Sequence, residues 1–225
     1  MAIRSKPNAM HAPPASDDKK CNKQFNQRAR DLKNGLSDLQ KKVDKMKDGP
    51  EKQRLEASLT MLGTEGDHNG VGVAFSTLDG SAAGRTDLNL NASGQASPLI
   101  TLDPDSGKNG SSTTLAINAA HEGTHLVDQT TELLHAYNEL SWPNWIARSP
   151  TLSDFSLEYR GYQTSAWAAQ ALGVPSLAYD GGSSVIWNSS WAAADRQTLI
   201  DKGITQHVTS IPGHPETTPH NPWPN

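Results

Sequence analysis

The chain has little cysteine, little net charge and no long apolar segment. Its 225 residues include one cysteine, Cys21, so no disulfide can form within the chain and an oxidising compartment is not implied. Lys and Arg number 20 and Asp and Glu 24, and the formal net charge of -4 gives no reason to expect nucleic acid or an anionic membrane as a partner. No apolar run approaches the roughly 20 residues of a membrane-spanning helix.

The amino-terminal residues also lack the apolar segment that forms the core of a signal peptide. Residues 1–15 are polar and rich in proline, so we expect them to form a disordered arm. These absences predict a soluble protein. It would either stay in the cytoplasm or be exported without a cleavable signal peptide, as in specialised secretion.

A heptad pattern is the first positive feature of the sequence, and it predicts an amphipathic helical hairpin at residues 16–63. Apolar residues recur every three or four positions from Phe25 to Met46 and again from Leu55, on either side of Asp48-Gly49-Pro50. The hairpin could dock an immunity or delivery partner, or simply pack on itself and on the rest of the protein. Because the composition changes after Gly63, we expect the hairpin to be separable from the rest of the chain.

Short alternating segments with turn signals begin after this boundary. They predict strands at 71–78, 85–90 and 98–104, and therefore a small antiparallel sheet. One core helix is predicted from about Ser112, a second from Ser153-Asp154 to Leu172, and a last helix from Trp191 to Lys202. The fold class is thus α+β, with one domain at 64–205 and a Pro-rich tail at 206–225.

The motif that predicts a function is His-Glu-Gly-Thr-His at residues 121–125. Four residues are slightly more than one helical turn, so His121 and His125 project from one face and can bind one metal ion. Glu122 is too close in sequence to be a comfortable third ligand, but it can take a proton from a water held by that metal. The motif therefore predicts a zinc hydrolase with Glu122 as general base. The alternative is a solvated helix with two surface histidines, which the apolar flanks disfavour.

A catalytic zinc site takes three protein ligands and keeps one position open for water. The metzincin arrangement would need a His or Asp at position 131, which is Thr, and a Gly at position 128, which is Asp. Glu132 and Glu139 lie on or just beyond the motif helix and would have difficulty reaching back to the metal.

Glu158 is the best candidate for the third ligand. It lies on a separate predicted helix, among apolar and aromatic neighbours where an unpaired carboxylate would be costly. Asp154 is the fallback, although its position at the start of that helix favours a capping role.

With these residues the sequence resembles the zincin metallopeptidases of the gluzincin type, in which His-Glu-x-x-His is followed by a Glu on a downstream helix. More narrowly, the segments Ile100-Thr-Leu-Asp-Pro104, Ala119-Ala-His-Glu122 and Glu158-Tyr-Arg-Gly-Tyr-Gln163 resemble the compact zincins of bacterial effectors and polymorphic toxins. The resemblance covers roughly residues 71–173. The helical hairpin and both ends of the chain lie outside it.

The resemblance implies that His121, His125 and Glu158 bind Zn²⁺, and that Glu122 is the general base and then passes its proton to the leaving amine. It also implies that the strand at 99–102 is the sheet edge that holds an extended peptide. Gluzincins place an Asp four residues after the ligand Glu to orient a His, but here that position is Tyr162.

Two further roles stay open on the sequence alone. Asp128 could replace the missing orienting Asp, or it could be an ordinary surface charge. Tyr159, Tyr162 or His207 could stabilise the charge that develops on the carbonyl oxygen.

Three functions fit the sequence. The first is a zinc-dependent endopeptidase that acts on a protein or peptide, as in an effector or toxin. The second keeps the metal and the water but cleaves another amide, such as a cell-wall peptide cross-link. The third is an interaction protein in which the helical hairpin is the active part.

Overall fold

The computed structural model describes residues 19–63, 71–78, 82–90, 96–104, 109–139 and 153–174, together with seven residues between 198 and 209. The expected arm at 1–15, nearly all of the tail at 206–225 and most of the helix expected at 191–202 lie outside these residues. The elements, in chain order, are α1 (Lys19–Val43), α2 (Pro50–Leu62), β1 (Gly72–Phe75), β2 (Gly84–Leu90), β3 (Ala96–Leu102), α3 (Ser112–Glu139) and α4 (Asp154–Ala171).

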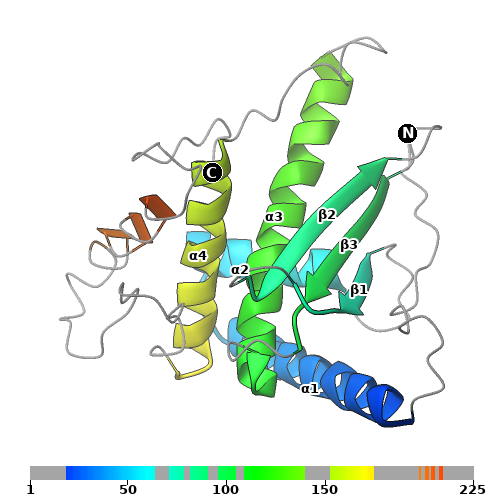
Figure 1. Cartoon of the computed structure of the whole chain (residues 1–225). Helices are drawn as coiled ribbons and strands as arrows, with labels where there is room; N and C mark the ends of the chain where they lie inside the picture. The colour runs from blue at the N-terminus through cyan, green and yellow to red at the C-terminus, as the bar shows by residue number, and fades with distance from the viewer. Residues whose placement is uncertain are drawn as a thin grey trace.

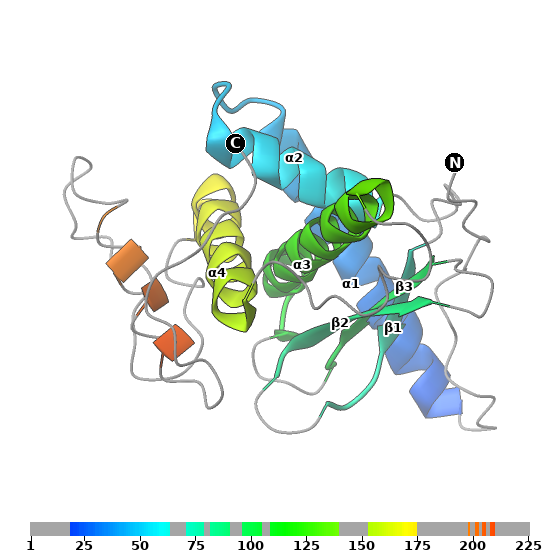
Figure 2. The same ribbon diagram turned by 90° about the horizontal axis from the view of Figure 1, so that it is seen from above.

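The described part of the chain has the α+β architecture that the sequence predicts. Helix α3 runs through the middle, with the sheet along one side, α4 on another, and α1 and α2 packed against it as well (Figures 1 and 2). No helix in the described ranges is long and apolar enough to cross a membrane.

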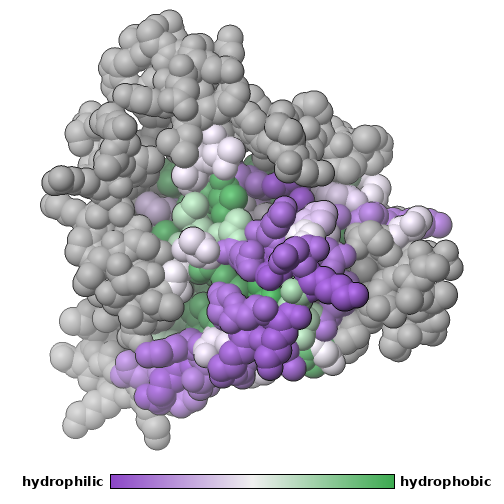
Figure 3. Space-filling view, turned by 180° about the vertical axis from the view of Figure 1, so that it is seen from behind, coloured by the Kyte–Doolittle hydropathy of each residue, from purple (hydrophilic) through white to green (hydrophobic). Residues whose placement is uncertain are grey.

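Helices α1 and α2 form where the heptad pattern predicts helices. Helix α2 has Pro50 as its first residue, where the missing N–H has no helical partner to lose, and it ends at Gly63, whose φ of 67° suits glycine. Seen from behind, the described surface carries many polar side chains, as expected for amphipathic helices (Figure 3). Their apolar faces are buried in the common core through Leu32, Leu39, Val43, Leu55, Leu59 and Leu62.

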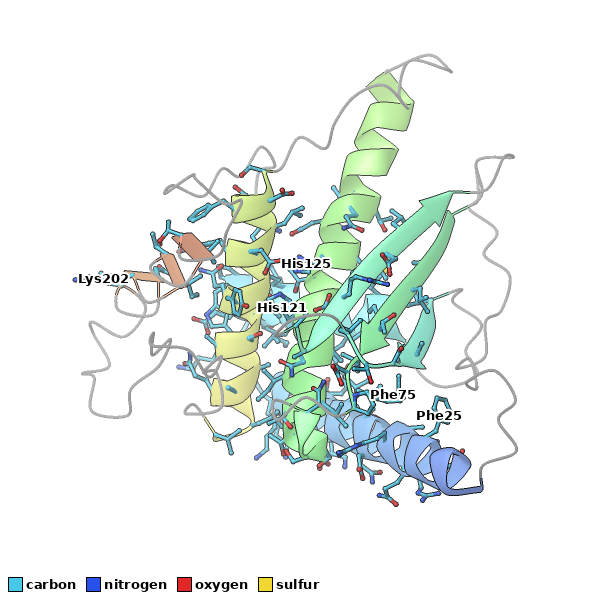
Figure 4. The ribbon with its side chains drawn as sticks, viewed as in Figure 1. Phe25, Phe75, His121, His125 and Lys202 are labelled. Atoms are coloured by element: carbon cyan, nitrogen blue, oxygen red, sulfur yellow. The ribbon has the colours of Figure 1, made fainter. Side chains whose placement is uncertain are left out.

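These two helices share one core with the rest of the protein. The Ser58 hydroxyl of α2 donates a hydrogen bond of 2.8 Å to the carbonyl oxygen of Ala120, the residue before His121. The Phe25 ring of α1 also contacts the Phe75 ring of β1 edge to face, with 5.7 Å between the centroids (Figure 4). This packing argues against the expectation that the hairpin can be removed without affecting the metal site.

A chain that begins at Thr64 is accordingly expected to lose cooperative folding. Each of the six buried Leu and Val side chains contributes about 1.5–3 kcal/mol by its burial, and the sum rivals the whole stability of a typical domain, about 5–15 kcal/mol. Thermal unfolding followed by circular dichroism would test this. A soluble truncated chain that unfolds cooperatively and binds zinc would instead support the expectation that the hairpin is separable from the rest of the chain.

The sheet is mixed, so the prediction of an antiparallel sheet is wrong for one of its two pairings. The strand order is β1-β3-β2, with β2 antiparallel and β1 parallel to β3. Alternation in the sequence predicts that a strand exists, but it carries no information about its partner or direction. Pro98 is tolerated in the central strand because β1 pairs only with the following residues, Leu99 to Leu102.

This strand order also corrects the expected substrate edge. The strand at 99–102 belongs to β3, which is the central strand and has a neighbour on both sides. Strand β2 lies at an edge and contacts α3 beside the His-Glu-x-x-His motif. The edge next to the candidate metal site is therefore β2.

Candidate metal centre

The motif lies on the buried part of α3. His121, Glu122 and His125 are 9%, 6% and 7% exposed, between the buried apolar residues Ala120 and Leu126. The alternative of a solvated helix with two surface histidines is therefore wrong. Both imidazoles lie on the side of α3 that faces α4 (Figure 4).

Helix α4 brings Glu158 to these two histidines, as the sequence predicts. Its Oε2 lies 3.5 Å from Nε2 of His121, and its Oε1 lies 3.6 Å from Nε2 of His125. The two Nε2 atoms are 2.9 Å apart. One ligand atom from each of the three residues falls within 4.8 Å of the others, so the group could hold a metal ion.

The donor set fits a tetrahedral zinc ion. Ligands at about 2.0–2.2 Å in tetrahedral geometry lie about 3.3–3.5 Å from one another. Each imidazole has one Glu158 oxygen close to this separation, Oε2 for His121 and Oε1 for His125, and the histidine pair would need to widen by a few tenths of an ångström. Two imidazoles and one carboxylate leave a fourth position open, which is the pattern of a catalytic site.

His125 is suited to coordination because its imidazole stays neutral. Burial lowers the pKa of His125 to about 4, with a further decrease from His121 that Glu158 opposes. At neutral pH its imidazole is uncharged, so one ring nitrogen has a lone pair for a metal.

Helix α4 also shapes the space around His121 through two residues that follow Glu158. The Ser165 hydroxyl lies 3.3 Å from Nδ1 of His121, which leaves Nε2 for the metal. Gly161 lies directly against the imidazole, where a Cβ atom would come within 2.6 Å of Nε2. Glu158, Gly161 and Ser165 therefore form one stripe of α4 that faces His121.

Strand β2 contacts Glu122, whereas α4 contacts the two histidines. The Thr86 hydroxyl lies 2.8 Å from Oε2 of Glu122 and 3.0 Å from its backbone oxygen. Gly84 leaves the space that the carboxylate occupies, since a Cβ atom there would meet Oε1 at 2.6 Å. Burial raises the pKa of Glu122, and His121 and the hydrogen bond from Thr86 oppose this rise. A raised pKa makes a carboxylate a stronger proton acceptor.

Asp128 fills neither of the two roles that the sequence leaves open. It is 2% exposed, so it is not a surface charge. Both of its oxygens accept hydrogen bonds from Arg160 of α4, at 2.7 and 2.9 Å. The hydroxyl that approaches an imidazole nitrogen of the site belongs to Ser165 instead. Asp128 thus ties α3 to α4.

The fallback ligand Asp154 is not part of the triad and is not the helix cap. Ser153 is the N-cap of α4, and its side chain accepts a hydrogen bond from the backbone N–H of Ser156. Asp154 is the first residue of α4 and is exposed.

Among the three residues considered for charge stabilisation, Tyr162 is the one that touches a ligand. Its ring packs edge-on against the imidazole of His121, with 4.7 Å between the centroids. Tyr159 is hydrogen-bonded to Asp201, and burial together with Asp201 raises its pKa. His207 lies outside the described residues.

A cleft of about 270 Å³ opens beside the triad between β2, α3 and α4, and Glu122, His125 and Glu158 line it. A substrate could therefore reach both the candidate metal position and the candidate base.

Neither a protein family model, nor a curated protein, nor a solved structure matches this chain significantly.

Sequence reasoning missed Thr86, Gly84, Gly161 and Ser165. Helical spacing could have indicated the two on α4, because positions three and seven after Glu158 lie on its face of the helix. Nothing in the sequence places Thr86 or Gly84 beside Glu122, because that contact depends on how the sheet packs against α3.

Proposed function

We propose that this protein is a zinc-dependent hydrolase with a zincin-like core that cleaves peptide bonds within a protein target. The observation that carries the proposal is the group of His121, His125 and Glu158, with ligand atoms within 4.8 Å of one another, beside the buried carboxylate of Glu122. A largely buried site of two imidazoles and two carboxylates costs folding free energy, and such groups are typical of sites that bind a metal or take part in chemistry.

In this proposal His121, His125 and Glu158 hold the zinc ion. When bound, zinc would act as a Lewis acid and lower the pKa of water at the open position. Glu122 would accept a proton from a water molecule as the water oxygen attacks the carbonyl carbon of the peptide. Glu122 would then give the proton to the amide nitrogen as the C–N bond breaks, which releases an amine and a carboxylic acid that keeps the second hydrogen of the water.

Strand β2 is the proposed platform for the substrate. It lies at the sheet edge within the described residues, and Thr86 bonds to Glu122 from this strand. Backbone groups on the side of β2 that faces away from β3 can hydrogen-bond an extended peptide and hold it across the cleft. This assignment replaces the strand at 99–102 that the resemblance implies.

Zinc analysis with one pair of variants tests the ligand set. Glu158→Ala is expected to lower zinc affinity by at least about 100-fold and to abolish cleavage, because two imidazoles from one helical turn hold zinc weakly. Asp154→Ala, one turn earlier on α4, should keep the zinc, because Asp154 is neither a ligand nor the cap. Zinc titration monitored by competition with a chelator measures both affinities.

If Asp154→Ala lowers zinc affinity and Glu158→Ala does not, Asp154 is the ligand and the assignment to the gluzincin type is wrong. A digest of a denatured proteome, compared with a digest of peptidoglycan, then separates the endopeptidase from an amidase that acts on cell-wall peptides.

A further inference from the structure

The cleft beside the metal position extends one helical turn beyond two of the three ligands. Gln129 follows His125 by four residues on α3, and Asp154 precedes Glu158 by four residues on α4, so each lies on the same helix face as its ligand. Gln129, Asp154 and the intervening Leu157 all line the cleft. The side of the cleft next to the candidate metal site is therefore defined by these three side chains.

Asp154 brings a negative charge to this part of the cleft that no described residue neutralises. Its carboxylate is exposed and makes no hydrogen bond or ion pair with the described part of the chain, and Ser153 already caps the helix. Arg85 is the basic residue that lines the cleft, but it is paired with Asp87 at 2.9 Å.

Gln129 adds an acceptor that also lacks a partner. Its Oε1 atom is buried and has no hydrogen-bond partner among the described residues. A buried carbonyl without a donor is destabilising, so a turn of the Gln129 side chain toward the cleft that brings it a donor from a ligand is favourable. A carboxylate and a free carbonyl on opposite helices are complementary to a group that is positively charged and rich in N–H donors.

We propose that this cleft selects peptides with a lysine or arginine side chain close to the scissile bond, and that Asp154 and Gln129 bind this side chain. The inference rests on the proposed function. One helical turn separates side chains by about 5–6 Å, and an extended peptide advances about 3.3 Å per residue. The basic residue therefore lies one or two positions from the bond that is cleaved. Leu157, half-buried in the same wall, covers the apolar stem of such a side chain.

Two sets of peptides test this inference on the full-length zinc protein. Acetylated and amidated peptides carry a single Lys, a Glu or a norleucine at each position around the cleaved bond. The natural protein is expected to show a kcat/KM about tenfold higher for the best Lys peptide than for its Glu counterpart. Asp154→Asn should bring this ratio to within about threefold of unity while the zinc content stays at the natural level. Asp38→Asn, a surface change on α1, should leave the ratio unaltered.

A binding measurement keeps this inference distinct from the proposed function. Zinc-loaded Glu122→Gln is titrated with the same peptides by fluorescence anisotropy, alone and combined with Asp154→Asn. A preference for Lys that disappears with Asp154→Asn, in cleavage or in binding, supports the inference. If binding shows this preference and the natural protein cleaves no peptide, the proposed function is wrong and the inference about the cleft is supported.

Cleavage without a preference for basic residues, or with one that survives Asp154→Asn, overturns the inference and leaves the endopeptidase in place. The absence of both cleavage and selective binding overturns both.

Discussion

Glu122→Gln is expected to bind zinc nearly as tightly as the natural protein and to lose turnover by about 10²–10⁴-fold, the usual contribution of a general base. The side chain is not among the three ligands, so its replacement leaves the donor set intact. Glutamine has the same shape, and its carbonyl oxygen can still accept the hydrogen bond from Thr86. Proton transfer is lost because an amide is too weak a base.

Zinc content by mass spectrometry and cleavage of a quenched fluorescent peptide would measure the two effects separately. Glu51→Gln, an exposed glutamate in the first turn of α2, is the matched control and should retain both properties. Unchanged hydrolysis in Glu122→Gln would contradict the role of Glu122 as general base. Loss of zinc in the same variant would instead make Glu122 a ligand.

The second large effect is expected for Gly161→Ala, which should lower zinc affinity by at least about 100-fold although Gly161 carries no ligand atom. A Cβ atom at this position would come within 2.6 Å of Nε2 and 2.7 Å of Cε1 of His121, closer than real Cβ contacts occur. The imidazole has little room to retreat, since Ser165 approaches Nδ1 and Tyr162 packs against the ring. Relief of the clash therefore turns or displaces the ligand.

This effect can be separated from a general loss of stability. Alanine is favoured over glycine inside a helix by up to about 1 kcal/mol, so α4 itself should not be weakened by the change. Gly49→Ala is the control, because Gly49 has extended backbone, with φ of 166°, and no atom within 4 Å of the added Cβ. Chelator competition and circular dichroism would show a folded Gly161→Ala protein with weak zinc binding. Equal zinc affinity in the two alanine variants would contradict the geometry of the α4 stripe.

The sequence alone determined the features that depend on local spacing. Two histidines four residues apart on a helix must share a face, so the pairing of His121 with His125 follows from helical geometry. Glu158 could be predicted because a carboxylate on a second, mostly apolar helix needs a partner. The helices α1 and α2 could be predicted from their heptad spacing, and the three strands from alternation between turn signals.

The tertiary structure decided everything that depends on which segments meet. Alternation along a strand does not specify its neighbours, so only the folded chain places β3 in the centre and β2 at the edge beside Glu122. Asp128 pairs with Arg160, and Ser165 approaches His121, because α4 crosses α3 in one particular register. The direction of each side chain follows from helical periodicity, but the partner that it meets is fixed by the packing of distant segments around α3.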